Sequence, residues 1–596
     1  MIELKIDGEF VDLAPNAKVN VRINNPFFTD DDIIPGDYSL PFDLASPEMS
    51  GKNSAIFGNN DAPESTDSFK RKPAELFYDG VLFKKGEVIN REVGDRMQVN
   101  MRFGMATIAE GFKALKLRDL MDEPIVIDAS SVTKKVHIKP GGRFNFTGDN
   151  PIKINGRDYD GTTLANLVAA INADITTPRA SATLVSSGTT PGGLAAPYIT
   201  ITSLASAGDP HVDLSVQEKV PNRDTSDSWI WQVEAEMSGY YAGFDSFFSS
   251  YKGAAPATNK FRIPAGYNDF YFRDGSGERI LTNQLQSGSF LQNLPTDDSP
   301  NASFQFLCFN RNNLQPLVML RYVFEKAAAY LGIGFEGDWV GEALYNSLLI
   351  HNTAPLGFLK PFVGEKPFLF WKRDFNIKDL VPDITFVDLL KALQSRYNLK
   401  ISYNENTNKI SIKKRETIAR STKKIDVSPM AGVASFVEDD SLTGLRLEVD
   451  KIDDKSFSLD YYNVGTPEKT WKVKCGEVGG GVRYTYNDSD DTKFPLRLIR
   501  YGGLVTGFNI YPVTNAPGTT NNENLSTLYE NEWKRFVQQR IDRKVIEVPL
   551  YWGMAELSTL DMDVKYRYDR NDYFIAWLDV ELTMTKINIK ATLYKA

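Results

Sequence analysis

Hydrophobic and polar residues alternate along most of the first 125 residues, which is the pattern of half-buried β-strands. It is clear in IELKI (2–6), in VNVRI (19–23) and through the long stretch 74–103. Turn residues divide this long stretch into a meander, with turns expected at Asp79-Gly80, Gly86 and Gly94-Asp95. The N-terminal part of the chain is therefore predicted to be a β-rich unit.

Two amphipathic helices are predicted near the two ends of the chain, where apolar residues recur every three or four positions. The first covers 106–121, with an apolar stripe of Ile108, Phe112, Leu115 and Leu120. The second covers 524–542, with a less regular stripe of Leu528, Trp533, Phe536 and Ile541. The second helix is followed by strands, and the last of these form a meander expected to turn at Arg570-Asn571-Asp572.

The stretch 375–416, FNIKDLVPDITFVDLLKALQSRYNLKISYNENTNKISIKKRE, predicts a helix, a sharp stop and a two-stranded hairpin. Thr385 and Asp388 have the spacing of a capping box, and Asn398 stands where a left-handed residue ends a helix. The expected buried stripe consists of Phe386, Leu389, Leu390, Leu393 and Tyr397. Its hairpin is expected to turn at 405–408.

An earlier stretch, 314–338, has the same order of features. A helix with one apolar face ends at Gly332, and the strand IGFEG (333–337) follows. Either one unit is used twice, or two helix–strand junctions resemble each other by chance. The sequence pattern is compatible with both interpretations.

Residues 126–217 change in character and predict a small α+β insert. Asn155-Gly156 marks a hairpin turn, and Thr163 can cap a helix. The apolar residues of that helix are Leu164, Leu167, Val168 and Ile171. A tip rich in glycine and proline at 189–197 separates two further strands, the second of which is YITITS (198–203).

The predicted fold class is multidomain and mainly β with α+β units: β-meanders or barrel-like tube domains, each braced by a helix, plus the small insert. The expected domains are a β-rich unit at 1–125, the insert at 126–217, an aromatic-rich β continuation at 218–300, an α+β domain at 301–435 and a β-rich unit with one helix at 436–596. In the third range, WIWQVEAEM (229–237) and NDFYFRDGSGERI (268–280) are expected strands, and YYAGFDSFFSSY (240–251) fits no pattern.

Composition supports a large folded protein, because 42% of the 596 residues are hydrophobic and 12% are aromatic. A net charge of -9 argues against a nucleic-acid channel or an anionic membrane surface. The short basic run KKR at 413–415 is expected to be a solvated strand end. We see no signal peptide and no apolar run long enough for a membrane span, so a soluble protein of a reducing cytoplasm is expected.

Residues able to carry chemistry are few and scattered. Cys308 and Cys475 lie far apart, which excludes a disulfide framework or a zinc knuckle, and the three histidines, His137, His211 and His351, occur in separate segments. Each histidine is expected to be a surface or strand residue. The glycine run at 479–481 lacks the lysine and hydroxyl residue of a phosphate-binding loop, so a turn is expected there.

Acidic and aromatic runs do not point to a reaction either. Asp30-Asp31-Asp32 and the DSDD run at 488–491 lack the alternating ligands of a calcium loop. Tyr461-Tyr462 could stack on a sugar, although aromatic strand residues more often belong to a core. No catalytic, cofactor-binding or metal-binding residue is predicted, and no cofactor. The chain is not expected to be an enzyme.

Several of these stretches together resemble structural proteins of tailed phages. The N-terminal pattern IELKIDGEFVDL, NNPFF, YSLPFDLASPEMSGKNSAIFG and PAELFYDGVLFKKGEV is similar to virion proteins of phages and prophages of Bacteroidetes. The stretches LRYVFEKAAAYLGIGFEGDW and 375–416 resemble tail-tip or baseplate hub proteins, and LYENEWKRFVQQRID with the closing strands fits the same group. The insert resembles the IN modules of flagellar hook-associated proteins.

This resemblance implies a subunit of the tail-tip or baseplate hub that ends the tail tube and organises neighbouring tail proteins. Such hubs are typically homotrimers with two tube-like β domains in each subunit. The implied partners are further copies of the chain, the tail tube, other tail-tip or baseplate proteins and, through the insert, the host surface. The implied location is the virion, with assembly in the host bacterial cytoplasm. The alternatives are a tail-associated receptor- or carbohydrate-binding protein and, less favoured, a glycan or peptidoglycan hydrolase.

Overall fold

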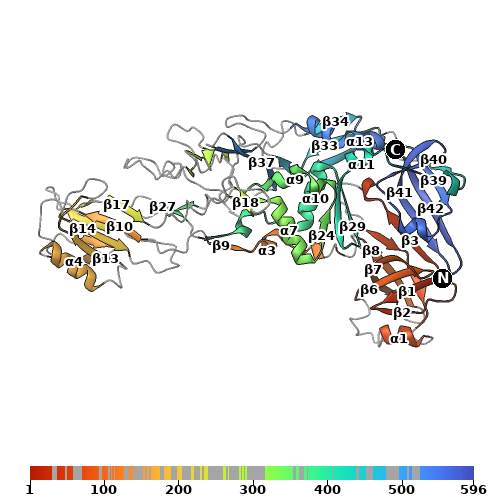
Figure 1. The fold of residues 1–596 in the computed structure, drawn as a ribbon, viewed down its shortest axis with the longest axis horizontal. Coiled ribbons are helices and arrows are strands. Elements are labelled where there is room, and N and C mark those ends of the chain that lie inside the picture. Colours follow the sequence, from red (N-terminus) through yellow and green to blue (C-terminus); the bar gives the residue numbers. More distant parts are fainter. Residues whose placement is uncertain are drawn as a thin grey trace.

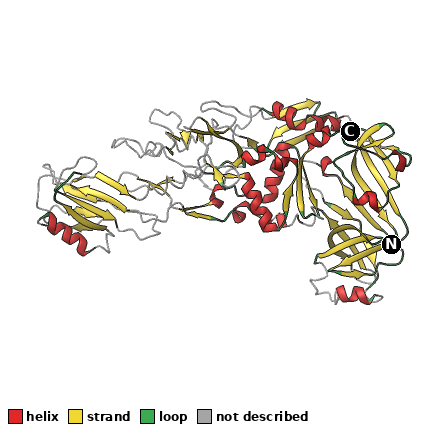
Figure 2. Cartoon of the chain, viewed as in Figure 1, coloured by secondary structure: helices red, strands yellow, loops and turns green. Residues whose placement is uncertain are grey.

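The computed structural model describes residues 1–29, 36–46, 50–57, 70–92, 97–104, 108, 111–112, 114–126, 133–138, 152–154, 157–159, 161, 163–174, 180–189, 197–203, 216–220, 228–230, 234–238, 260–262, 266–267, 281–282, 285–286, 289–290, 316–352, 357–360, 368–371, 374–405, 407–437, 442–450, 461–477, 496–505, 509–512, 524–541 and 543–596. Strands occur in every part of this structure, and most helices gather in its middle (Figure 2). The predicted fold class, mainly β with α+β units, is confirmed.

The largest sheet has 14 strands and joins the two ends of the chain. Its first strands are β1 (Ile2–Ile6), β2 (Glu9–Val11), β3 (Val19–Asn24), β4 (Asp37–Ser39), β5 (Phe42–Leu44), β6 (Lys72–Tyr78), β7 (Val81–Glu92) and β8 (Met97–Phe103). Its later strands are β31 (Lys424–Asp426), β32 (Ser435–Val437), β39 (Val545–Leu550), β40 (Lys565–Tyr568), β41 (Asn571–Leu582) and β42 (Ile587–Lys595). The main path runs from β2 to β32 and does not close on itself within the described residues.

The two halves of this sheet meet where β3 pairs antiparallel with β41, with Val19 opposite Leu582. Strands from 1–125 and from 436–596 therefore form one sheet, and Figure 1 shows both chain ends at the same end of the molecule. Short helices accompany the sheet: η1 (Pro26–Phe28), α1 (Gly51–Phe57), η5 (Ser428–Met430) and α14 (Met554–Ser558).

The alternation of hydrophobic and polar residues places the hydrophobic side chains on the inner face of this sheet, as predicted. Leu4, Val21 and Leu76, for example, are buried. Asp79 and Gly80 both have positive φ and form the expected tight turn. Gly86, however, lies inside β7 and forms no turn. A Cβ there would lie 2.0 Å from the Arg102 carbonyl oxygen, so glycine is needed because β8 approaches closely.

The last meander also turns slightly earlier than expected. Asp569 (φ 44) and Arg570 (φ 66) are the two left-handed residues between β40 and β41. Asn571 already begins β41, and Asp572 pairs with Arg567 across the hairpin. Two consecutive residues with positive φ suit the right-handed twist of a hairpin, which fixes this turn at 569–570.

Two helix–stop–strand units lie in the middle of the molecule (Figure 1). The first consists of α7 (Leu320–Leu331), the left-handed Gly332 and β24 (Gly334–Glu336). The second consists of α10 (Phe386–Tyr397), the left-handed Asn398, β29 (Leu399–Asn404) and β30 (Lys409–Lys414). Both predicted helix ends are confirmed. β24 pairs with β30, which pairs with β29, so the two units share one three-stranded sheet.

The predicted cap of α10 is also confirmed. The Thr385 hydroxyl accepts from the Asp388 N–H at 3.1 Å, and the Asp388 carboxylate accepts from the Thr385 N–H at 3.2 Å. Leu389, Leu390 and Leu393 are buried in the central hydrophobic cluster.

The helix expected at 106–121 does not run through. Residues 111, 112 and 114 are helical, but Leu115 and Lys116 leave the helix before the short α3 (Leu117–Leu120). The Leu115 carbonyl oxygen accepts from Phe386 N–H at 2.8 Å, and Leu117 N–H donates to Ile384 at 2.9 Å. The backbone here pairs with the start of α10 because those hydrogen bonds replace the helical ones.

A smaller sheet of β33 (Gly444–Val449), β34 (Tyr461–Gly465) and β35 (Lys469–Val473) carries the helix predicted at 524–542. This helix is built from α12 (Leu525–Leu528), a π-helical turn η6 (Tyr529–Trp533) and α13 (Lys534–Ile541). Leu528, Trp533 and Phe536 are buried. The five-residue step from Leu528 to Trp533 fits a π turn, which explains the irregular stripe.

The insert folds around its own hydrophobic cluster. It contains β10 (Thr133–Ile138), β11 (Ile152–Ile154), β12 (Arg157–Tyr159), α4 (Leu164–Ala173), β13 (Ala180–Val185) and β14 (Tyr198–Ser203). Thr163 caps α4 as predicted, accepting from Asn166 N–H at 3.1 Å. Its two sheets also take β15 (Val216–Val220), β16 (Ser228–Ile230) and β17 (Glu234–Ser238) from beyond residue 217.

The remaining elements surround the central helices. Those before residue 348 are β9 (Pro124–Val126), β18 (Phe261–Arg262), β19 (Gly266–Tyr267), β20 (Leu281–Thr282), β21 (Leu285–Gln286), β22 (Ser289–Phe290), β23 (Leu317–Met319), α8 (Asp338–Gly341) and α9 (Ala343–Ser347). The later ones are β25 (Leu348–Ile350), β26 (Gly357–Lys360), β27 (Phe368–Trp371), β28 (Asp374–Asn376), η4 (Ile377–Leu380), α11 (Arg415–Arg420), β36 (Gly476–Glu477), β37 (Arg497–Val505) and β38 (Asn509–Pro512). The stretches 240–251 and 268–280 lie outside the described residues.

We expect Leu390→Ala to lower the free energy of unfolding by about 3 kcal/mol, because the side chain is fully buried and its removal leaves a cavity. Leu390→Asp should prevent folding, since it would bury a charge without a partner. Denaturant unfolding of the purified chain measures the first change, and soluble yield the second. Lys391→Ala on the same helix is the control and should change stability by less than about 0.5 kcal/mol. A fully soluble, stable Leu390→Asp chain would contradict the burial of this helix face.

Candidate functional site

The histidines lie apart in the structure. His137 in β10 is buried, with Nδ1 2.9 Å from the Thr200 hydroxyl. His351 follows β25 and is also buried; burial and the charge of Arg497 hold its pKa well below the usual value. His211 lies outside the described residues. Within the described part of the chain, no three His, Cys, Asp or Glu side chains come close enough together to hold a metal ion.

The other residues singled out from the sequence do not assemble either. Cys475 is buried, with Sγ 3.4 Å from the Ala392 carbonyl oxygen. Tyr461 is exposed beneath the Arg446 guanidinium, whereas Tyr462 packs on Tyr529. The two tyrosines point to opposite faces of β34 and form no common platform. Cys308 and the runs 30–32, 479–481 and 488–491 lie outside the described residues. The helices that the structure does describe are too short or too polar to serve as membrane spans.

The basic run at 413–415, predicted to be a solvated strand end, is instead held among acidic and aromatic side chains. Lys413 binds Asp563 (Nζ–Oδ2 2.5 Å), and Lys414 binds Glu342 (Nζ–Oε2 3.0 Å). Arg415 is 1% exposed. The run does end a strand, because β30 stops at Lys414, but it is not solvated as predicted. The sequence did not indicate this, because the partners come from segments distant in sequence. We call the three residues of this run, together with Lys400 and with Asp563, which binds Lys400 and Lys413, the charged joint.

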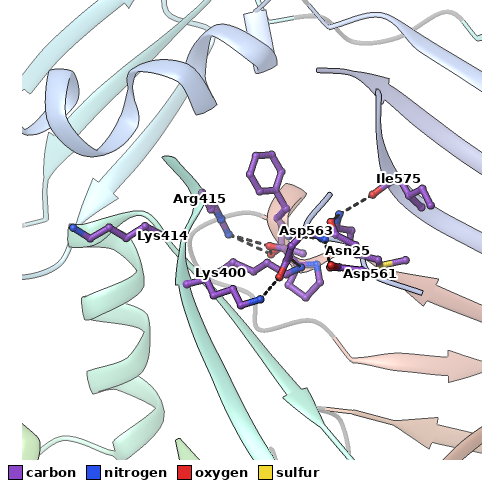
Figure 3. Close-up of polar contacts among 12 residues, drawn as sticks. Asn25, Lys400, Lys414, Arg415, Asp561, Asp563 and Ile575 are labelled. Atoms are coloured by element: carbon purple, nitrogen blue, oxygen red, sulfur yellow. Dashed lines mark hydrogen bonds and ion pairs between the residues drawn. The ribbon is translucent and has the colours of Figure 1, made fainter. Parts of the chain in front are cut away.

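Asp563 is the centre of the charged joint. Its carboxylate binds Lys400 from β29 with one oxygen (Figure 3) and Lys413 from β30 with the other. Lys400 is only 5% exposed. Burial would raise the pKa of Asp563, but the two lysine charges outweigh burial and hold that pKa below its usual value. The carboxylate thus stays ionised and fixes the hairpin β29–β30 to the segment before β40.

Arg415 connects the same hairpin to the N-terminal segment. Its Nη2 donates to the Pro26 carbonyl oxygen at 3.2 Å, and its guanidinium lies 4.9 Å from the ring centroid of Phe536. Asn25, just before Pro26, donates to the Ile575 carbonyl oxygen at 2.7 Å (Figure 3). One cation therefore contacts the N-terminal segment and the helix α13 at once.

Lys414 adds a link to the C-terminal helix. Its Nζ lies 3.6 Å from Glu532 in the π turn, besides its bond to Glu342. Burial raises the pKa of Glu532, although the charges of Lys414 and Arg396 act against it. The Glu532 carbonyl oxygen also accepts from the Asn398 side chain at 2.8 Å. The residue that ends α10 is thereby bound directly to the C-terminal helix.

The charged joint holds together three hydrophobic clusters, those of the large sheet, the central helices and the helix α12–α13. Each of its charged side chains contacts another protein group. The charged joint fixes the large sheet, the central helices and the helix α12–α13 relative to one another.

An exposed apolar surface lies at the edge of the large sheet. β32 pairs with β39, and its other edge has no strand partner among the described residues. Val433 is 89% exposed, Phe436 86% and Tyr551 72%, and Val437 is also exposed. We call these four residues the edge patch. Exposed, apolar edge strands are sites at which a further strand can add.

A groove of about 680 Å³ runs over the neighbouring face of this sheet. It lies between Tyr38 and Leu40 on one side and Ser435 in β32 on the other. Two ion pairs stand in it, Arg22–Asp579 at 2.6 Å and Lys590–Glu547 at 2.5 Å. The edge patch and this groove give the sheet a mixed apolar and charged outer surface.

We expect Asp563→Asn to lower the free energy of unfolding by about 3 kcal/mol, because Lys400 would keep a buried charge without its carboxylate. Since the folded-state pKa of Asp563 lies below its unfolded value, the carboxylate stabilises the protein above about pH 4. This contribution is lost as the pH falls through the folded-state pKa, so the variant should show less acid destabilisation than the wild type. Denaturant unfolding between neutral and acid pH measures both effects.

Asp383→Asn is the matched control. Asp383 pairs with Lys116 at 3.3 Å on the surface and away from the charged joint, so its loss should change stability by less than about 1 kcal/mol. Equal effects of the two substitutions would contradict the central role of Asp563.

No protein-family model and no curated protein matches the sequence. Among solved structures, the chain is similar to the 43 kDa tail protein of prophage MuSo2 from Shewanella oneidensis, at 6% identity over 99% of this chain and 97% of that chain, with a TM-score of 0.30. It is similar to a tail protein from Neisseria meningitidis MC58, at 6% identity over 100% and 96%, with a TM-score of 0.23. It is also similar to a PdpA–VgrG complex, at 10% identity over 100% of this chain and 64% of that chain, with a TM-score of 0.24. TM-scores this low do not establish a shared fold, so a function has to be argued from the chain's own residues.

Proposed function

We propose that this chain is a structural subunit of a phage tail, placed at the tail tip or baseplate hub, and that it carries out no chemical reaction. The proposal is supported by the sequence resemblance of the N-terminal pattern and of 314–338 and 375–416 to virion and hub proteins. It is also supported by a fold in which charged residues join sheets and helices. Its proposed partners are further copies of the chain in a homotrimer and neighbouring tail proteins, in a virion assembled in the host cytoplasm.

The observation that carries the proposal is the edge patch on β32. Unpaired N–H and C=O groups on an edge strand can bind a strand of a neighbouring chain, and apolar side chains beside them add buried area. Phe436 and Val433 are too exposed to stabilise the isolated chain. In a ring of identical chains, this edge is covered by the next copy, because a closed ring leaves no subunit with a free edge.

The charged joint suits such a subunit. A tail tip must keep its shape while the tail binds a cell, so its units need fixed relative positions. Salt bridges buried among three hydrophobic clusters hold one arrangement, because any other would leave Lys400 or Arg415 buried without a partner.

A second role, contact with the host surface, is proposed for the insert. Its hydrophobic cluster contains residues of 154–201 alone, so it is built as a separate body. In Figure 1 it lies at the end of the molecule away from the large sheet. Binding of surface polysaccharide by the full chain, lost on replacing the insert by a short linker, would support this role.

We expect the purified chain to self-associate as its concentration rises, and the double variant Val433→Lys/Phe436→Lys to stay monomeric. Lysines on an edge strand repel an added strand and remove the apolar contact. Analytical ultracentrifugation measures the association, and thermal unfolding should show an unchanged monomer, because both side chains are exposed. Tyr330→Lys on α7, where the tyrosine is 70% exposed, is the control and should associate normally. A wild-type chain that remains monomeric at high concentration would contradict the proposal.

A further inference from the structure

A basic cleft of about 1,020 Å³ lies beside the charged joint, on the side of the C-terminal helix. It is bordered by α11, by η6 and α13, and by the ends of β40 and β42. In Figure 1 these elements surround the marked C-terminus. The cleft is open to solvent and takes no part in the edge patch.

The cleft concentrates positive charge in a chain whose net charge is -9. The lining residues that the structure describes carry seven basic side chains, namely Arg420, Lys534, Arg535, Arg543, Lys544, Lys565 and Lys595, against Glu416 and Glu530. Counting the carboxylate of Ala596 as a third negative charge still leaves an excess of positive charge. Such an excess attracts anions, and the attraction is strengthened where the cleft walls exclude water.

Both glutamates are already bound within the cleft. Glu416 binds Arg420 at 3.0 Å and accepts from the Arg535 N–H at 3.1 Å. Glu530 binds Lys534 at 2.7 Å. Neither carboxylate is therefore available to neutralise the other cations.

Three lysines, Lys544, Lys565 and Lys595, form no ion pair with any residue that the structure describes. Lys565 Nζ lies 5.8 Å from the ring centroid of Phe574, and Asp572, whose charge acts on this lysine, already binds Lys424, and Arg567 at 3.1 Å. Each of the three lysines can thus give its charge to a ligand.

Lys565 shows the repulsion among the cations of the cleft. Burial lowers its pKa, and the charges of Lys424 and Arg535 lower it further, while Asp572 offsets only part of this effect. A bound anion would remove the repulsion among these cations. Binding an anion in the cleft is therefore electrostatically favourable.

The lining also distinguishes between kinds of anion. Its described lining residues include no aromatic ring on which a nucleic-acid base could stack, and the net charge of the chain repels a long polyanion. The three arginines of the lining are engaged, since Arg420 and Arg535 lie 3.0 and 3.8 Å from Glu416 and Arg543 donates to the Tyr594 hydroxyl. The cations that remain are lysines, which bind an anion as single point charges and not through a planar fork. Gln538 and Gln539 add amide groups that can bind a peptide backbone.

We propose that this cleft binds an acidic peptide segment of a neighbouring protein, with Lys544, Lys565 and Lys595 as the residues that bind its carboxylates. This site is independent of the strand edge proposed above as the contact between copies. A chain that failed to self-associate could still bind such a segment, so the two proposals fail separately.

The test uses the full chain and a fluorescein-labelled oligo-glutamate peptide, followed by fluorescence anisotropy. We expect saturable binding that weakens with added salt, because the contacts are between solvent-facing charges. The variant Lys544→Gln/Lys565→Gln/Lys595→Gln should bind about tenfold more weakly or worse. A control variant with the same change in net charge, Lys18→Gln/Lys52→Gln/Lys409→Gln, replaces exposed lysines on other elements and should bind as the wild type does.

Oligothymidylate and inorganic polyphosphate serve as competing probes. Displacement of the peptide by either at a lower concentration than unlabelled oligo-glutamate would overturn the choice of a peptide. Absence of binding, or equal weakening by the two triple variants, would overturn the site itself. Thermal unfolding of both variants checks that each is folded, because Lys565 is partly buried against Phe574 whereas the other five lysines are exposed.

Discussion

The arrangement of this molecule depends on one carboxylate. Asp563 neutralises two lysines that belong to adjacent strands of the central hairpin, and one of them is almost completely buried. A buried ammonium without a carboxylate is strongly unfavourable, whereas nonpolar contacts tolerate small shifts. The hairpin β29–β30 can therefore take only one position relative to the segment that leads into β40. The large sheet, to which β40 belongs, is fixed to the central helices by this contact.

The aromatic residues around Arg415 depend on that position. Phe27 stacks on Phe574 at 5.1 Å and meets Phe536 edge-on at 5.4 Å, so rings from the N-terminal segment, β41 and α13 share one cluster. Arg415 covers Phe536 and is held by the backbone of Pro26. Phe27 and Phe574 lie 547 positions apart in the sequence (574 − 27), and their contact stands beside the pairing of N- and C-terminal strands in one sheet.

Local features of this fold were predictable, because they depend on neighbours in sequence. The capping box of Thr385 and Asp388, the left-handed stops at Gly332 and Asn398, and the buried stripe of α10 all follow from spacing alone. The burial of Arg415 could not be predicted, because its partners at Pro26 and Phe536 lie far away in the chain. The same holds for Leu115 and Lys116, whose backbone left a well-formed helical pattern to pair with α10. Tertiary hydrogen bonds outweighed local preference there.

The two candidate surfaces were also hidden from the sequence, and one strand borders both. Val545 at the start of β39 pairs with Val437 of the edge patch, while Lys544, one residue earlier, lines the basic cleft. Exposure of Phe436 depends on which strand β32 joins, and the positive charge of the cleft depends on residues between 416 and 595 meeting at one place. The edge patch and the basic cleft thus contact neighbouring residues of the chain, Val545 and Lys544. The edge patch offers backbone hydrogen bonds and apolar contacts, whereas the basic cleft offers charge. Because the two surfaces bind through different interactions, a chain at the edge and an acidic segment in the cleft can be different partners, and either contact can be lost without the other.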